Sequence, residues 1–128
     1  MDLRKFDSIT LADKGVELVL DPKTATNPGA GIFLHGADSA AHKAKRREID
    51  LRNSERRSPP SPDDIEAQTF EILVACTKGW HGLIEDGKEL VFSPAEAEKL
   101  YRNYPEIRYR VADFIFTRAN FFPTASAN

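Results

Sequence analysis

The fold is decided by the stretch from Trp80 to Phe122, WHGLIEDGKELVFSPAEAEKLYRNYPEIRYRVADFIFTRANFF, which joins a tight turn to two helix starts. Asp86-Gly87 lies between two short apolar runs, and this dipeptide favours the two positive-φ positions of a hairpin turn. Ser93-Pro94 then begins a helix, because the serine hydroxyl can accept from the backbone of Glu96 and the proline already has a helical φ. We predict a small hairpin followed by a helix that runs to about Asn103.

A second helix is predicted to begin at Pro105, since proline is tolerated in the first turn of a helix. The apolar residues that follow recur every three or four positions and form one stripe, made of Ile107, Val111, Phe114, Ile115 and Phe122. One face of this last helix is therefore expected to lie in the core.

Upstream of this stretch, two short apolar runs can pair as a first hairpin. Val16–Leu20 is rich in β-branched residues and leucine, and Gly31–His35 is a second such run. The connection between them spans about ten residues, which exceeds the usual hairpin loop of two to five residues. We predict an antiparallel pair with an unusually long loop.

A polar segment follows Asp38 and Ser39, either of which can cap a helix. Its composition favours helix over residues 40–57, but it has few apolar positions, so we expect a helix that is mostly exposed or that faces a partner. Ser58–Pro62 contains three prolines and must break this helix, and we interpret it as a hinge.

Ser61-Pro62 repeats the serine-proline helix start seen later in the chain. We predict that this helix ends near Gly79. The residues expected along one of its faces are Ile65, Thr69, Ile72, Leu73, Cys76 and Trp80. This helix and the last one are expected to form the core pair.

The composition places the whole chain in one class. Its 128 residues fit one domain, and 41% hydrophobic with 30% charged residues is typical of a globular protein rather than a disordered one. We predict a single α+β domain over residues 1–128, with a small antiparallel strand element of one or two hairpins packed with about four helices. Residues 1–15 are expected to be a flexible arm or a short turn, and residues 123–128 a flexible tail.

No stretch has the features of a signal peptide or the roughly 20 apolar residues that span a bilayer. The lone Cys76 excludes an intramolecular disulfide framework and is expected to be a small buried hydrophobe. His35, His42 and His81 are dispersed and lack a second ligand at helical spacing. We assign no catalytic, metal or cofactor site, and we expect a cytoplasmic protein that is not an enzyme and has no membrane partner.

One basic run stands out against a formal charge of −2. It consists of Lys43, Lys45, Arg46, Arg47, Arg52, Arg56 and Arg57. Such a run can contact phosphates, yet it contains acids and has no interleaved aromatic residues for stacking on bases. A solvated helix, or one facing an acidic protein partner, is favoured over a nucleic-acid site.

Three aromatic residues near the end of the chain allow two interpretations. Phe116 lies off the apolar stripe, and the adjacent Phe121 and Phe122 cannot face the same way. They form either an exposed apolar patch for a partner or a satellite of the core. Under the first interpretation, aspartate at positions 121 and 122 would abolish partner binding and leave the fold intact.

The order of these features resembles the tail assembly chaperones of long-tailed bacteriophages and prophages. The resemblance rests on Trp80, Asp86, Gly87, Phe92, Ser93, Glu96, Leu100, Tyr101, Pro105, Ile107, Val111, Phe114 and Ile115. Val16–Pro22 and Gly31–Ser39 are similar to the start of the same proteins, so the likeness covers most of the chain.

The resemblance implies that the protein binds the helical tape measure protein while the tail tube assembles. The tail tube protein and a second copy of the chain are further implied partners, and many relatives also have a longer frameshifted product. Phe116, Phe121, Phe122 and the basic helix residues Lys43, Arg46, Arg47, Arg56 and Arg57 are the partner-binding candidates. The alternatives are a structural tail or head–tail component and a small nucleic-acid-binding regulator that uses helix 43–57.

Overall fold

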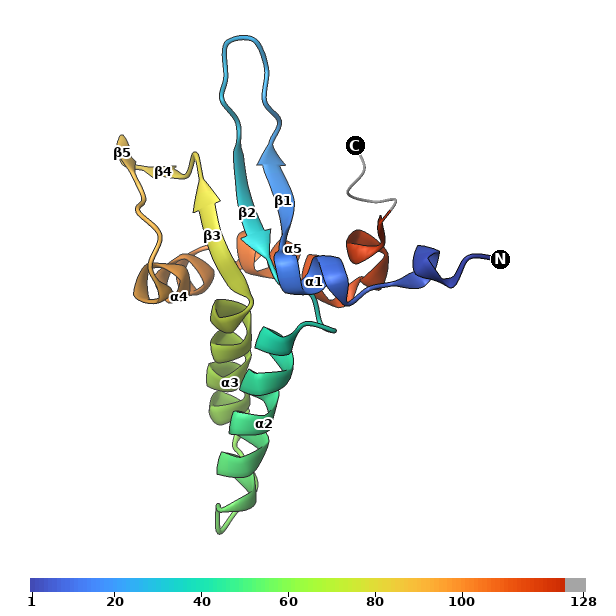
Figure 1. Cartoon of the computed structure of the whole chain (residues 1–128). Coiled ribbons are helices and arrows are strands. Elements are labelled where there is room, and N and C mark those ends of the chain that lie inside the picture. The colour runs from blue at the N-terminus through green and yellow to red at the C-terminus, as the bar shows by residue number, and fades with distance from the viewer. Residues whose placement is uncertain (124–128) are drawn as a thin grey trace.

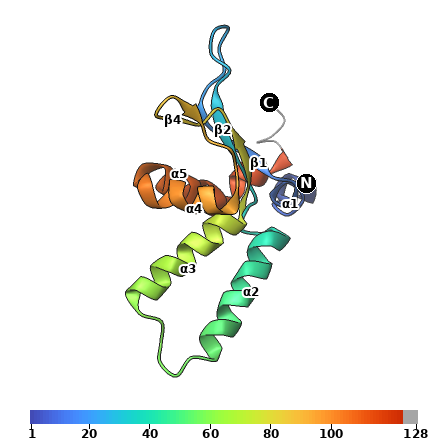
Figure 2. The same ribbon diagram turned by 90° about the vertical axis from the view of Figure 1, so that its left-hand side faces the viewer.

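The computed structural model describes residues 1–123 and has an α+β fold, as predicted. A three-stranded sheet lies in the upper part of the molecule, and a helical hairpin projects away from it (Figure 1). Two further helices lie on one side of the sheet, and the N-terminal segment lies on the other (Figure 2).

The sheet is antiparallel with the order β1-β2-β3. The predicted pair is confirmed: β1 (Val16–Asp21) pairs with β2 (Ala30–Leu34), with Leu18 opposite Ile32. Ile32 is fully buried because β2 is the central strand, with a neighbour on both edges. The third strand, β3 (Thr77–His81), was not predicted.

The predicted end of the helix near Gly79 is therefore wrong, because α3 (Pro62–Ala75) stops four residues earlier and the chain turns into β3. Trp80 lies opposite Ile32 in the strand, not on a helix. Its ring packs edge-on against Phe92 at 5.0 Å, and its Nε1 donates to the Leu90 carbonyl at 2.9 Å. Pairing with β2 makes the segment after Ala75 a strand instead of a continued helix, and such long-range pairing has no local signal in the sequence.

The helical hairpin consists of α2 (Ala40–Ser54) and α3. Ser39, not Asp38, caps α2 by accepting from the His42 backbone at 3.1 Å. A complete capping box begins α3, where the Ser61 hydroxyl accepts from the Asp64 backbone and the Asp64 carboxylate accepts from the Ser61 backbone. The proline-rich segment forms the turn between the two helices, as its sequence predicts.

The hairpin turn and the last two helices match their local signals. Asp86 (φ 52°) and Gly87 (φ 78°) connect the two-residue strands β4 (Ile84–Glu85) and β5 (Lys88–Glu89). Helix α4 spans Pro94–Asn103, with Ser93 as its cap, and α5 spans Pro105–Phe116. The predicted continuation of the α5 stripe to Phe122 is wrong, since a short 3-10 helix, η2 (Arg118–Phe121), follows an extended Thr117.

The N-terminal segment is more structured than a free arm up to residue 15. It contains a 3-10 helix, η1 (Leu3–Phe6), and a short helix, α1 (Thr10–Lys14). Ala12 is fully buried, and the Asp13 carboxylate accepts from the Ala40 backbone at 2.7 Å, which joins α1 to the start of α2. The predicted tail lies, apart from Pro123, outside the described residues.

The core forms where β2 meets the C-terminal half of α3, α4 and α5. Its buried members include Ile32, Leu34, Ile49, Phe70, Leu73, Cys76, Leu100, Tyr101, Val111 and Ile115. Helix α3 packs mainly on α2 and α4 and touches α5 less, so the expected α3–α5 core pair is only a minor contact. Ile65 and Thr69 are exposed, because the first turns of α3 project beyond the body of the molecule (Figure 2).

Candidate functional site

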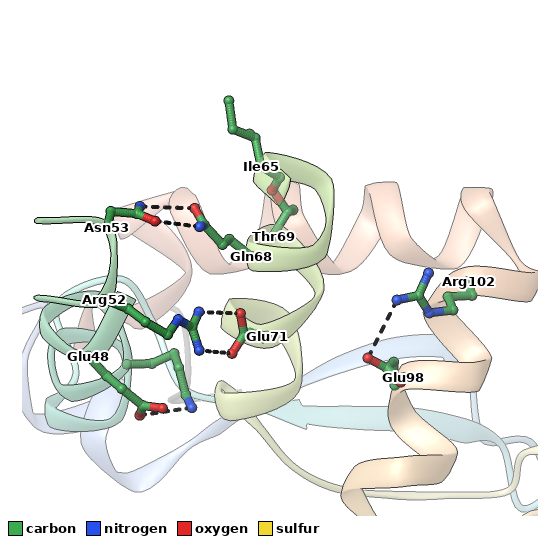
Figure 3. A network of polar contacts seen from close by, with 10 residues as sticks. Glu48, Arg52, Asn53, Ile65, Gln68, Thr69, Glu71, Glu98 and Arg102 are labelled. Atoms are coloured by element: carbon green, nitrogen blue, oxygen red, sulfur yellow. Dashed lines mark hydrogen bonds and ion pairs between the residues drawn. The ribbon is translucent and has the colours of Figure 1, made fainter. Parts of the chain in front are cut away.

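The basic run of α2 serves first to bind α3. Arg52 donates two hydrogen bonds to the Glu71 carboxylate, at 2.9 and 2.6 Å, and this contact holds the pKa of Glu71 below its usual value. Next to this pair, the amides of Asn53 and Gln68 exchange hydrogen bonds at 3.2 and 2.7 Å (Figure 3). The two helices are therefore joined along this stretch by complementary polar side chains.

Two more cations of the run have partners within the hairpin. Arg56 donates to the Asp64 carboxylate at 2.6 Å, and Lys45 pairs with Glu48 at 3.0 Å. The remaining four, Lys43, Arg46, Arg47 and Arg57, are exposed and have no ion-pair partner within residues 1–123. The charge available to an external partner is thus about half of what the sequence suggests.

Phe121 is a core residue, so of the two interpretations the core one holds at this position and the exposed patch does not. It is only 1% exposed and packs edge-on against Phe114 at 5.5 Å. Its ring also covers Gly36, where an added Cβ would lie 2.8 Å from the ring. The 3-10 turn after α5 directs Phe121 inward, and helical spacing could not predict this turn.

Phe116 and Phe122 lie in different surroundings. Phe122 is partly buried and meets Phe6 edge-on at 6.0 Å. Phe116 is 49% exposed and contacts the buried His42 ring at 5.5 Å. The three phenylalanines therefore do not form one exposed patch, and Phe116 alone keeps a large exposed surface.

A groove of about 600 Å³ lies between the end of α3 and the start of α4. We call it the α3–α4 groove. Its apolar lining comes from Val74, Ala75, Phe92, Pro94 and Ala95, and the polar residues around it are Lys45, Glu71, Thr77 and Glu98. A volume of this size suits a few large apolar side chains of a partner.

This groove was not predicted, although two of its features can be read in the sequence. Val74 and Ala75 are apolar but lie beside the core positions Leu73 and Cys76 rather than on them. Ala95 is a small exposed residue in the first turn of α4 and leaves space next to Phe92. What no local pattern shows is that these two segments face each other.

Hydrogen bonds under the groove hold its two walls together. The Thr77 hydroxyl lies 2.7 Å from the Leu73 carbonyl and 2.7 Å from the Tyr101 hydroxyl, so it connects α3, β3 and α4. Tyr101 is fully buried, and this burial raises its pKa to about 12. The groove therefore has a rigid base rather than a loop for a floor.

The charges at the groove already have partners. Glu71 is bound by Arg52, and Lys45 by Glu48. Glu98 lies 3.6 Å from Arg102, with both side chains half exposed (Figure 3). This last contact is long and solvent-exposed, so the Glu98 carboxylate is the most available charge of the lining.

The cysteine thiol and two of the histidine rings are held by burial or by hydrogen bonds to the backbone. Cys76 is fully buried, which raises its pKa to about 12 and keeps it a neutral thiol. The Nδ1 atoms of His35 and His42 donate to the carbonyls of Ala12 and Ala37, at 3.0 and 2.8 Å. Within residues 1–123, no group of three His, Cys, Asp or Glu side chains is placed to hold a metal ion.

A second, smaller cleft of about 220 Å³ lies between the β4–β5 hairpin and the α4–α5 corner. Its lining includes Ile84, Leu90, Tyr104 and Ile107, and the Tyr104 hydroxyl donates to Glu85 across it. This bond holds the hairpin against the helices. The α3–α4 groove is larger and is the stronger candidate for a binding site.

None of the helices in the described part of the chain is both long and apolar enough to cross a membrane. Comparison with protein-family models, curated protein sequences and solved structures gave no match.

Proposed function

We propose that the protein is a tail assembly chaperone of a bacteriophage or prophage, which binds the tape measure protein while the tail tube assembles and which catalyses no reaction. The supporting observation is the α3–α4 groove, an unfilled apolar surface in a protein whose sequence resembles that family. The proposal places it in the cytoplasm of the bacterial host, with the tail tube protein as a second partner.

The client side chains in this proposal are those of an amphipathic helix. A client helix presents apolar residues at three- and four-residue spacing, and a groove that covers such a stripe keeps the helix from aggregating. Val74, Ala75 and Phe92 supply apolar contacts, while Glu98 meets polar residues at the edge of the client stripe. The client is released when tube subunits cover the same stripe over a larger area.

The test is co-expression of this chain with the longest helical reading frame beside its gene, followed by a pull-down at moderate salt. Ala95→Trp fills the groove from an exposed position and is expected to reduce client recovery at least tenfold. Ala44→Trp is the matched control, because Ala44 is an exposed helical alanine outside the groove lining. Equal recovery with both variants would remove the groove from the proposal.

The two alternatives have their own outcomes. A structural tail or head–tail component remains in purified particles, whereas a chaperone is absent from them. A nucleic-acid-binding regulator retains DNA in a salt-dependent way that weakens when Arg46, Arg47 and Arg57 are neutralised. The ion pairs of Arg52 and Arg56 within the hairpin weigh against this third function.

A further inference from the structure

The N-terminal arm, which we define as Met1–Ile9, carries three exposed apolar side chains, one of which, Phe6, packs in part on Phe122. Leu3, Phe6 and Ile9 recur every three residues and are 73%, 58% and 53% exposed. Leu3 and Phe6 begin and end η1, and a 3-10 helix has three residues per turn, so both side chains lie on one face.

The carboxylates of the arm hold its local shape. Asp2 accepts from the Arg4 backbone at 3.0 Å, and Asp7 accepts from the Ile9 and Thr10 backbones at 2.9 and 3.1 Å. The Thr10 hydroxyl, which also donates to Asp7, and these two backbone N–H groups lower the pKa of Asp7. Because both carboxylates accept these hydrogen bonds, the arm has a defined shape. It presents an apolar face with the exposed Lys5 beside it.

The α3–α4 groove has the complementary character. Its lining is mainly apolar, and Glu98 at its edge is held only by a long, exposed contact with Arg102. The N-terminal segment and α4 lie on opposite sides of the molecule (Figure 1), and the groove is lined by the start of α4. Because Phe6 packs on Phe122 and α1 is joined to α2, the arm stays on its own side.

We infer that the arm of one copy binds in the α3–α4 groove of a second copy. Leu3 and Phe6 cover the apolar lining, including Val74 and Phe92, and Lys5 lies beside Glu98 of the other copy. Both surfaces present apolar side chains, and the Lys5 ammonium is opposite in charge to the Glu98 carboxylate. The inference concerns this chain alone and does not depend on the proposed client.

The contact is head-to-tail, because the two surfaces differ and lie on opposite sides. Repetition of such a contact produces a ring or an open chain of copies, not a two-fold dimer. The interface is small, so we expect weak association that increases with protein concentration. If the groove also binds the client, the arm and the client compete for it.

Disulfide trapping tests the contact in the full-length protein. Lys5→Cys and Glu98→Cys are made as separate variants, the second with a C-terminal tag so that the mixed dimer has its own mass. The native Cys76 is fully buried and does not compete. After mild oxidation of the mixture, we expect at least fivefold more mixed dimer than when Lys5→Cys is paired with Glu55→Cys, an exposed position on the α2–α3 turn.

Two further substitutions, one on each surface, decide the interpretation. Leu3→Asp on the arm and Ala95→Trp in the groove should each reduce the trapped dimer at least fivefold while leaving the circular dichroism spectrum unchanged, since both positions are exposed. Trapping equal to that of the Glu55→Cys pair, or a yield that neither substitution changes, would overturn the inference. Absence of client recovery by the wild-type protein, with trapping intact, would count against the proposed function only.

Discussion

The hydroxyl of Thr77 connects the two walls of the α3–α4 groove, and its hydrogen bonds can be assigned from chemistry. The Leu73 carbonyl can only accept, so the single hydroxyl proton of Thr77 goes to it over 2.7 Å. The Tyr101 hydroxyl, 2.7 Å away, must then donate to the Thr77 oxygen. Each replacement at this chain of bonds leaves a different group unpaired.

Thr77→Val removes the central group and leaves two buried polar groups without partners. These are the Tyr101 hydroxyl, which is fully buried, and the Leu73 carbonyl, and each unpaired group costs about 1–3 kcal/mol of unfolding free energy. Tyr101→Phe alone removes one donor and leaves the bond from Thr77 to Leu73, which costs about 1 kcal/mol. The valine variant is therefore expected to be the less stable of the two.

The effect of Tyr101→Phe on the unfolding free energy is expected to change sign when Thr77 is valine. Once Thr77 is valine, Tyr101→Phe deletes an unpaired buried hydroxyl, so it should raise the unfolding free energy by about 1–3 kcal/mol, although it lowers stability in the wild-type protein. Urea denaturation of the four proteins, with an unchanged slope as the check on two-state unfolding, measures this. A loss from Tyr101→Phe of equal size in both backgrounds would refute the assigned hydrogen bonds.

Three further predictions concern other parts of the chain. Phe121→Ala should cost about 3–5 kcal/mol of unfolding free energy and Phe122→Ala about 1 kcal/mol, because the first ring is buried and the second is only partly so; equal midpoints in urea would contradict this burial. Burial lowers the pKa of His42, so below pH about 6.5 the unfolded chain binds a proton more readily and stability falls as the pH decreases. His42→Asn can keep a donor to the Ala37 carbonyl, and it should lose less unfolding free energy between pH 7.5 and 5.5 than the wild-type protein loses. Parallel pH profiles of the two proteins would contradict this role of His42. Arg52→Gln should lower the urea midpoint slightly at low salt and less in 1 M salt, since it breaks an exposed bidentate contact with Glu71; a loss that salt does not change would require another cause.

The sequence by itself determined the features that depend on neighbouring residues. The turn at Asp86-Gly87, the serine caps at Ser61 and Ser93, and the bounds of α4 follow from local backbone chemistry and agree with the structure. The β1–β2 pair was also predictable, because its two apolar runs are close in the chain and can face each other in only a few ways.

Only the tertiary structure decided the features that depend on distant residues. The chain after Ala75 is a strand because the free edge of β2 is available to it, although its own pattern continues a helix. Phe121 is buried because a turn after α5 directs it toward Gly36. Two of the seven cations of the basic run, Arg52 and Arg56, are occupied because α3 folds back along α2. The α3–α4 groove, likewise, exists only where two segments separated in sequence are brought face to face, and a periodic pattern within one segment contains no information about the surface opposite it.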